Sequence, residues 1–339
     1  EIRNAAVFEV DGFDAITTDS FIATGTEHVR EFKDREESMR VIAASIGGEN
    51  RIGPWSVDYR LSYSKAEEDT PYDFETIYEL SDVIDVRYSG SDTNVLRIEQ
   101  LAGPDFTDPA SYEFDEVELE DQLVEEDDIS FEGNAAYAFA ENRMLRKIQF
   151  GALGRFKSKD SELETFVSDD NPPAIEDFAA FSTFDRRDPY GTGLPYVAQD
   201  FRSTFLENES AFAMERDLAD SSIEDFQSDE DVLAAYFQAE LTASAWDIVF
   251  GARVEDTDFE TRGFAYNDDT ETVEPTRGEN SYTNFLPGIH FRRGIGEDMV
   301  FRFSAHRAIA RPNFEQTLPG AEIEGDEVSV GNPELDPLE

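Results

Sequence analysis

Several segments of the chain alternate apolar and polar residues, the pattern of β-strands whose two faces meet different surroundings. The segment 55–63 shows it clearly, because one face would be polar and the other would carry Trp55, Val57, Tyr59, Leu61 and Tyr63. The same alternation returns over 129–139, 246–254 and 299–305. On this pattern we expect roughly eight clear strands, with about two more in the remaining stretches.

The strands fall into pairs that predict four antiparallel hairpins. The expected pairs are 36–48 with 53–65, 125–141 with 144–160, 229–243 with 245–264, and 280–295 with 298–310. Within each pair the connection is short, at 49–53, 141–143, 243–245 and 296–298. The stretches between pairs are long and acidic, at 66–124, 161–228 and 265–279.

Short turns at one end of a sheet and long loops at the other are typical of a membrane-spanning barrel. A soluble β-sandwich has short loops at both ends. We therefore expect an all-β fold: an antiparallel transmembrane β-barrel segment with long acidic extracellular loops.

Composition is compatible with this fold and excludes some partners. The 339 residues include 77 acidic and 28 basic ones, which gives a formal net charge of −49. Such a surface repels phosphates, so we expect no nucleic-acid partner. The chain also has 28 Phe, 12 Tyr and 2 Trp, too many aromatic residues for a disordered acidic protein. No run approaches the ~18 apolar residues of a transmembrane helix, but transmembrane strands need only ~10 alternating residues.

Alternation also predicts which way the side chains point. The residues expected to face lipid are Trp246, Ile248, Phe250, Met299, Phe301 and Phe303. Arg253, Arg302 and His306 lie on the opposite faces of their strands and would line the interior. There they could contact a plug domain or an anionic substrate, although solvation and pairing with neighbouring acids are slightly favoured. Aromatic residues near strand ends predict girdles at the membrane surfaces: Trp55, Tyr63, Tyr137, Phe139, Trp246, Phe264, Tyr266, Tyr282 and Phe285.

The sequence carries no recognisable catalytic constellation. The three histidines, His28, His290 and His306, lack a metal-ligand spacing, and there is no cysteine, nucleophile elbow or phosphate-binding loop. We expect no enzyme activity, no cofactor and no metal site. Acidic runs such as 125–128 and 228–231 offer oxygen ligands to calcium, but a solvated loop is the favoured reading.

Two motifs near the end of the chain resemble a known family. They are Arg311-Pro-Asn-Phe314 and Gly331-Asn-Pro-Glu-Leu-Asp-Pro337, and the hairpin over 226–263 supports them. Together they resemble the barrel of TonB-dependent outer-membrane receptors, especially the type abundant in Xanthomonas- and Caulobacter-like bacteria. The resemblance covers about 36–65 and 125–339. It implies a place in the bacterial outer membrane, with residues 1–339 as part of a 22-stranded barrel from which the plug domain and last strands are absent.

The resemblance also implies a function, namely active uptake of a nutrient. The energy would come from the TonB complex, reached through the TonB box of the plug, and the other partners would be the nutrient and outer-membrane lipid. An oligosaccharide is favoured over a siderophore or cobalamin, and the acidic loops favour a neutral saccharide. We expect binding through loops 66–124 and 161–228, including Tyr190 and Tyr196, together with interior side chains.

Two alternatives from other classes stay open. One is a soluble extracellular acidic β-protein that binds glycans or calcium. The other is a passive porin-like channel.

Overall fold

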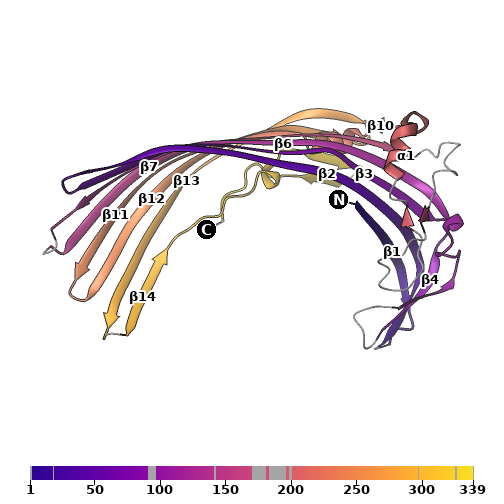
Figure 1. The fold of residues 1–339 in the computed structure, drawn as a ribbon, viewed down its shortest axis with the longest axis horizontal. Coiled ribbons are helices and arrows are strands. Elements are labelled where there is room, and N and C mark those ends of the chain that lie inside the picture. The colour runs from indigo at the N-terminus through magenta and orange to yellow at the C-terminus, as the bar shows by residue number, and fades with distance from the viewer. Residues whose placement is uncertain are drawn as a thin grey trace. The chain divides into compact units, whose positions relative to one another are not determined.

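The computed structural model describes residues 2–17, 19–90, 97–140, 143–169, 181–182, 196–197, 201–296, 298–324 and 327–338, and most of them lie in antiparallel strands (Figure 1). The long strands are β1 (Ile2–Asp14), β2 (Ser20–Ile52), β3 (Trp55–Leu80), β6 (Tyr112–Ala138), β7 (Leu145–Ser168), β11 (Phe226–Ala243), β12 (Trp246–Asn267) and β13 (Thr272–Ile295). Shorter ones are β4 (Ile84–Ser89), β5 (Arg97–Ala102), β10 (Glu215–Arg216) and β14 (Met299–His306).

The main sheet follows the order β14-β13-β12-β11-β7-β6-β3-β2-β4-β5, and β1 pairs with β2. The chain forms two compact units. Unit 1 comprises residues 1–37, 70–122 and 164–217, and unit 2 comprises 38–69, 123–163 and 218–339. Among the described residues, no helix has the length and apolar character needed to cross a membrane.

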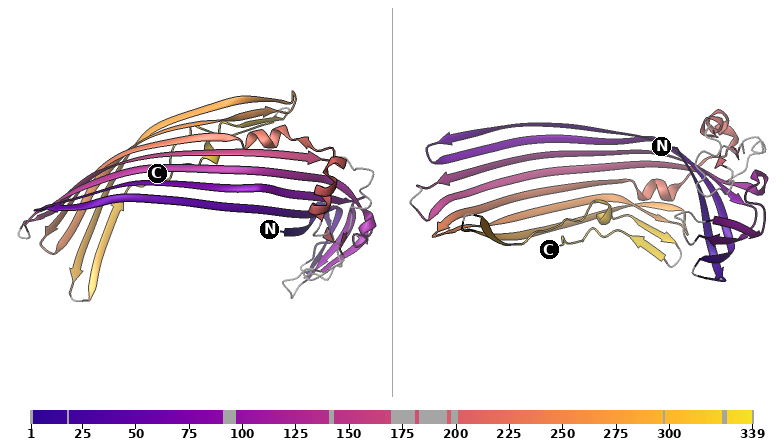
Figure 2. Two further views of the ribbon diagram at one scale, coloured as in Figure 1. Left: turned by 45° about the horizontal axis from the view of Figure 1, so that its top comes forward. Right: turned by 60° about the horizontal axis from the view of Figure 1, so that its bottom comes forward.

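The four predicted hairpins are confirmed. Trp246 pairs with Ala243 across one turn and Met299 pairs with Ile295 across another. The connections lie at the same end of unit 2 (Figure 2). Tight two- and three-residue turns need a residue with positive φ, and the chain supplies Gly53 at 60°, Ser244 at 58° and Gly296 at 66°.

The predicted long connections contain more strand than expected. β3 continues to Leu80 and β6 begins at Tyr112, with β4 and β5 between them. The expected loop 265–279 is wrong, because β12 and β13 are joined by the turn 268–271. In that turn the Oδ1 atom of Asn267 accepts hydrogen bonds from the backbone N–H and hydroxyl of Thr270, at 3.0 and 2.9 Å. An asparagine side chain that accepts from the backbone of a following residue in this way favours a tight turn.

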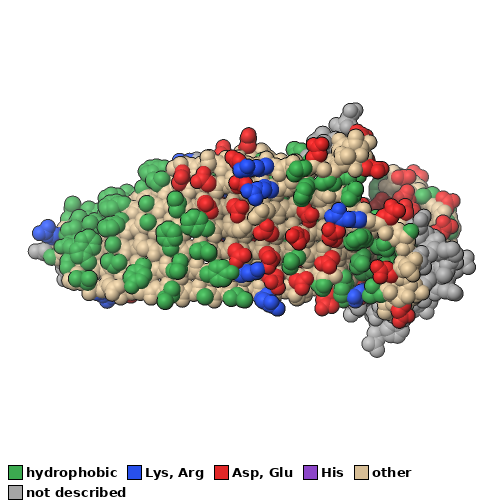
Figure 3. All heavy atoms as spheres, turned by 90° about the horizontal axis from the view of Figure 1, so that it is seen from above, with side chains coloured by type: hydrophobic (Ala, Val, Ile, Leu, Met, Phe, Trp, Pro, Cys, Tyr) green, Lys and Arg blue, Asp and Glu red, His purple; other side chains and the backbone are tan. Residues whose placement is uncertain are grey.

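The outer face of unit 2 changes from apolar to acidic along its strands. On β12 every second residue faces outward. These outward residues are apolar over the nine-residue span from Trp246 to Val254, and the next three are Asp256, Asp258 and Glu260. Its neighbour β11 changes at the same level, where Leu233 lies opposite Asp256 and Asp231 lies opposite Asp258. Figure 3 shows hydrophobic side chains gathered toward the hairpin end of this face and acidic ones beyond them. A strand needs ~9–11 residues to cross a membrane, so the apolar rows have the length of one crossing.

Aromatic rings cluster at the hairpin end of these rows. The Trp55 ring lies 5.1 Å from that of Tyr137, and the Trp246 ring lies 5.9 Å from that of Phe301. This placement fits the predicted girdle. Three of its predicted members lie elsewhere: Phe264 and Tyr266 lie beyond the acidic part of β12, and Tyr282 lines a cavity on the inner face.

Unit 1 has its own core, built partly by the helix α1 (Phe201–Asn208). Phe201 and Phe205 are four residues apart and so share one face of the helix. Both pack on Phe74, with ring centroids 5.9 and 5.1 Å away. Tyr78 and Phe32 complete the centre of this cluster. This packing holds α1, which belongs to the chain segment between β7 and β11, against the core of unit 1.

His28 is a buried titratable group in this core. The Tyr112 hydroxyl lies 3.1 Å from its Nδ1 atom, and the Phe8 and Phe106 rings pack against its imidazole. His28 falls in the first third of β2, in the part of that strand that belongs to unit 1. Burial, and then the nearby charge of Arg30, lower the pKa of His28 to about 3.

We expect this histidine to make unit 1 sensitive to mild acid. The folded pKa of His28 lies below the unfolded value of ~6.5, so its contribution is fully present above pH 6.5 and is lost as the pH falls toward 3. Hydrogen exchange of β2 should therefore speed up between pH 6.5 and 5 after correction for intrinsic rates. His28→Phe should remove most of that dependence, whereas His290→Phe, an exposed control in unit 2, should leave it intact. An unchanged slope in His28→Phe would contradict this assignment.

Candidate binding site on the inner face

The segment after β14 turns back across the inner face of unit 2, and we call residues 307–320 and 331–338 the inner strap. The backbone N–H of Arg307 donates to Pro287 at 3.1 Å, and the Nδ2 atom of Asn280 donates to the carbonyl of Leu335 at 3.1 Å. The ring of Phe314 stacks on Phe259 of β12 at 5.9 Å. These contacts hold both family-like motifs against the wall of the sheet.

Local chemistry keeps the strap out of the ladder after β14 ends at His306. Six residues later, Pro312 has no backbone N–H and cannot resume a strand pairing. Just after it, the Asn313 side chain accepts from the Gln316 N–H at 2.9 Å, and the Gln316 side chain accepts from the Asn313 N–H at 3.1 Å. This reciprocal pair resembles a capping box and closes a single turn. Gly278 on β13 allows the second half of the strap to approach, because a Cβ atom there would collide with Pro333.

Arg311 anchors the strap through charge. Its guanidinium forms an ion pair with Glu255, lies 3.3 Å from the Thr257 hydroxyl and 3.7 Å from the Glu230 carboxylate. Arg253 contacts the same Glu255 carboxylate at 2.5 Å. Two arginines therefore share one acid on the inner face of β12.

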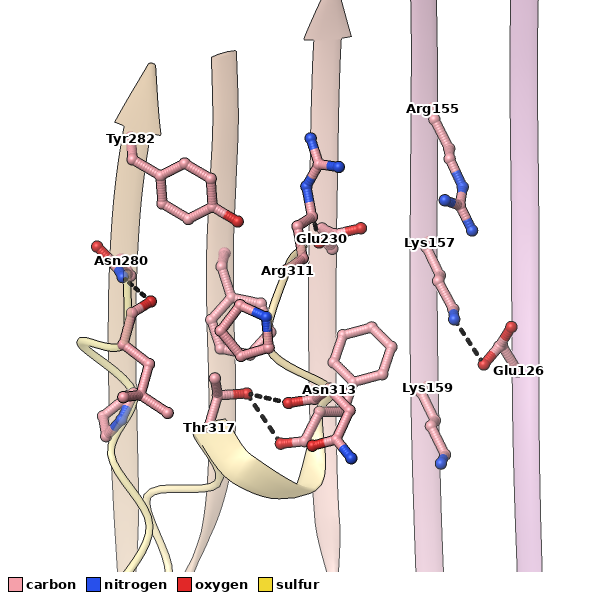
Figure 4. A pocket seen from close by; sticks show the side chains of 15 residues that line it. Glu126, Arg155, Lys157, Lys159, Glu230, Asn280, Tyr282, Arg311, Asn313 and Thr317 are labelled. Atoms are coloured by element: carbon pink, nitrogen blue, oxygen red, sulfur yellow. Dashed lines mark hydrogen bonds and ion pairs between the residues drawn. The ribbon is translucent and has the colours of Figure 1, made fainter. Parts of the chain in front are cut away.

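A cavity of about 410 Å³ lies between the strap and the sheet. Arg155, Lys157 and Lys159 form one side of it, on alternate residues of β7, and their side chains stand in one column in Figure 4. Arg311 and Asn313 of the strap lie on the same cavity. Its acidic lining residues are Glu126 and Glu230, so the local charge is positive in a strongly acidic chain.

A second cavity, of about 490 Å³, lies closer to the hairpin end. It brings together two residues predicted from the sequence, Arg253 and His306, and adds His290 and Glu255. The His290 and His306 rings stack with centroids 6.2 Å apart. Arg302 does not line it, although it shares the inner face of β14 with His306 and lies opposite Arg292.

Of the two predicted tyrosines, the structure describes the backbone of one. Tyr196 lies in the short strand β9 (Tyr196–Val197), which pairs with β8 (Phe181–Ser182) in unit 1. Tyr190 lies outside the described residues. Within the described part of the chain, no group of three or more potential ligands could hold a metal ion.

The basic row on β7 is the feature that the sequence analysis missed. Its signal was present, since Arg155-Phe-Lys-Ser-Lys159 places three cations on alternate residues of a predicted strand. The sequence did not show that the strap lies opposite this basic row. The row forms one side of a cavity only because the strap is there.

Comparison with known proteins gives the membrane context. Residues 182–338 match the outer membrane protein beta-barrel family. The chain is part of an outer-membrane β-barrel. Its place is the bacterial outer membrane, as the resemblance implied, and the soluble alternative is excluded.

Solved structures and curated proteins were the other two comparisons. A crystal structure of the ferric citrate transporter FecA in the unliganded form is similar over 91% of this chain, with 10% identity and a TM-score of 0.33. The barrel segment spans 41% of that transporter chain. No curated protein matches the sequence.

Proposed function

We propose that the protein is an outer-membrane receptor that imports a nutrient with energy from the TonB complex. The observation that carries this proposal is the inner strap. The residues that resemble the receptor family, Arg311–Phe314 and Gly331–Pro337, fold onto the inner face and form one side of a charged cavity. An interior that is partly filled by chain and lined with charge suits selective binding better than free diffusion.

A saccharide is the proposed substrate, with siderophores and cobalamin as the other classes imported by similar receptors. Aromatic and amide side chains around the cavity, among them Phe314, Asn280 and Asn313, suit the apolar faces and hydroxyl groups of sugars. The proposal includes a plug domain as the link to the TonB complex. It includes no covalent step.

Energy dependence is the decisive test. Cells that express the full-length receptor should take up saccharide only while the inner-membrane proton gradient and the TonB complex are intact. Dissipating the gradient should reduce uptake to the level of cells without the receptor, although surface binding should persist. Uptake that continues without the gradient would refute the proposal and identify a passive channel.

A further inference from the structure

The cavity under the inner strap differs electrostatically from the rest of the molecule. Acidic residues outnumber basic ones by 77 to 28 in the chain, yet four of the six charged side chains around this cavity are basic. Three of them come from alternate residues of β7, so backbone alternation directs all three into the same space. The earlier expectation of a neutral saccharide rested on the charge of the whole loops. The local charge of this cavity favours an anion.

Not all of these cations are neutralised by neighbours. Arg155 pairs with Asp128 at 2.7 Å and Lys157 pairs with Glu126 at 2.8 Å. Among the described residues, Lys159 has no carboxylate within ion-pair distance, and its Nζ atom lies 5.8 Å from the centre of the Phe226 ring. A partly enclosed ammonium group without a carboxylate gains most from an anionic ligand.

The uncharged groups around the cavity restrict the chemical class of the ligand further. Phe259 and Phe314 form an aromatic wall, and the Lys157 ammonium lies 4.9 Å from the centre of the Phe314 ring. Asn280, Tyr282 and Asn313 add hydrogen-bonding groups. The volume of about 410 Å³ falls in the ~300–1,000 Å³ range of small-molecule sites. Aromatic faces with amides suit a sugar ring, and the ammonium groups suit a carboxylate.

We propose that this cavity binds an acidic saccharide and that Lys159, with Lys157 beside it, receives the uronate carboxylate. The inference rests on the proposed function for the route by which the sugar arrives, and it names the chemical class of that sugar. Asn280 and Tyr282 would then hydrogen-bond ring hydroxyls, and the Phe259–Phe314 wall would cover the apolar face of the ring.

Calorimetric binding to the purified full-length receptor in detergent tests the site directly. The probes are digalacturonate and its methyl ester, which has the same rings without the charge. Loss of a charge-assisted hydrogen bond weakens binding by about tenfold or more. We therefore expect the ester, and separately Lys159→Gln with digalacturonate, to bind about tenfold more weakly. Lys147→Gln is the matched control, because Lys147 lies on the same strand and pairs with Glu240 at 3.3 Å.

The outcomes separate this inference from the proposed function. Equal binding of acid and ester, or unchanged binding in Lys159→Gln, would overturn the acidic-saccharide site even if energy-dependent uptake of another sugar is observed. Conversely, charge-selective binding with gradient-independent uptake would preserve the site and refute the active receptor. Tighter binding of inorganic phosphate than of digalacturonate would also overturn the inference, since the site would then be a phosphate site. Circular dichroism of Lys159→Gln confirms that the barrel is folded.

Discussion

Replacing Phe250 with arginine is expected to destabilise the folded barrel by about 2–4 kcal/mol, the range for a charge at mid-membrane depth on the lipid face. Phe250 is the central residue of the apolar row on β12, midway between Trp246 and Val254. Its side chain is exposed on the outer face. A guanidinium there has no water or carboxylate within the hydrocarbon, so it must reach toward a membrane surface or distort the bilayer.

Phe301→Arg provides the matched control. Phe301 is also among the residues predicted to face lipid, but the register places it opposite Arg293, which lies opposite Trp246 at the end of the row. A charge at that level should cost only about 0–1 kcal/mol. Denaturant unfolding in lipid vesicles, followed by tryptophan fluorescence and by gel mobility, measures both variants. Equal destabilisation by the two substitutions would disprove the depth assignment.

The membrane explains which parts of the fold could be predicted from sequence. Near the hairpins, one face of each strand meets lipid and the other does not, so alternation is strong and the four hairpins were found. Beyond the apolar rows both faces are polar. There Asp256, Asp258 and Glu260 face outward on a strand that continues to Asn267, and the pattern no longer distinguishes strand from loop. The predicted loop 265–279 failed for this reason.

The candidate site was only partly predictable. Alternation alone placed Arg253 and His306 on the inner face, and the structure adds that they share a cavity. The path of the inner strap depends on contacts between residues far apart in sequence, such as Asn280 with Leu335. Periodicity carries no information about such pairs. Tyr282 was therefore assigned to a girdle, although it lines the cavity under the strap.

The second large effect is expected from Glu255→Gln, at the anchor of the inner strap. The Glu255 side chain is 10% exposed and that of Arg311 is 26% exposed, so solvent screens their charges weakly. Removing one partner of a fully buried pair costs ~3–5 kcal/mol, because the remaining charge is left without compensation. Since Glu230 still lies 3.7 Å from Arg311, we expect a smaller loss of about 2–3 kcal/mol. Hydrogen exchange should also rise over residues 307–317.

A double substitution decides whether the loss comes from the uncompensated charge. Adding Arg311→Gln to Glu255→Gln removes both members of the pair, so it should restore part of the lost stability. Glu260→Gln is the surface control. Its partners Arg262 and Arg277 are each 55% exposed, and solvent-exposed pairs contribute little to stability. If the effects of Glu255→Gln and Arg311→Gln simply add, the two side chains are not coupled. The strap would then be held by Phe314, Asn280 and the turn at Asn313 rather than by charge.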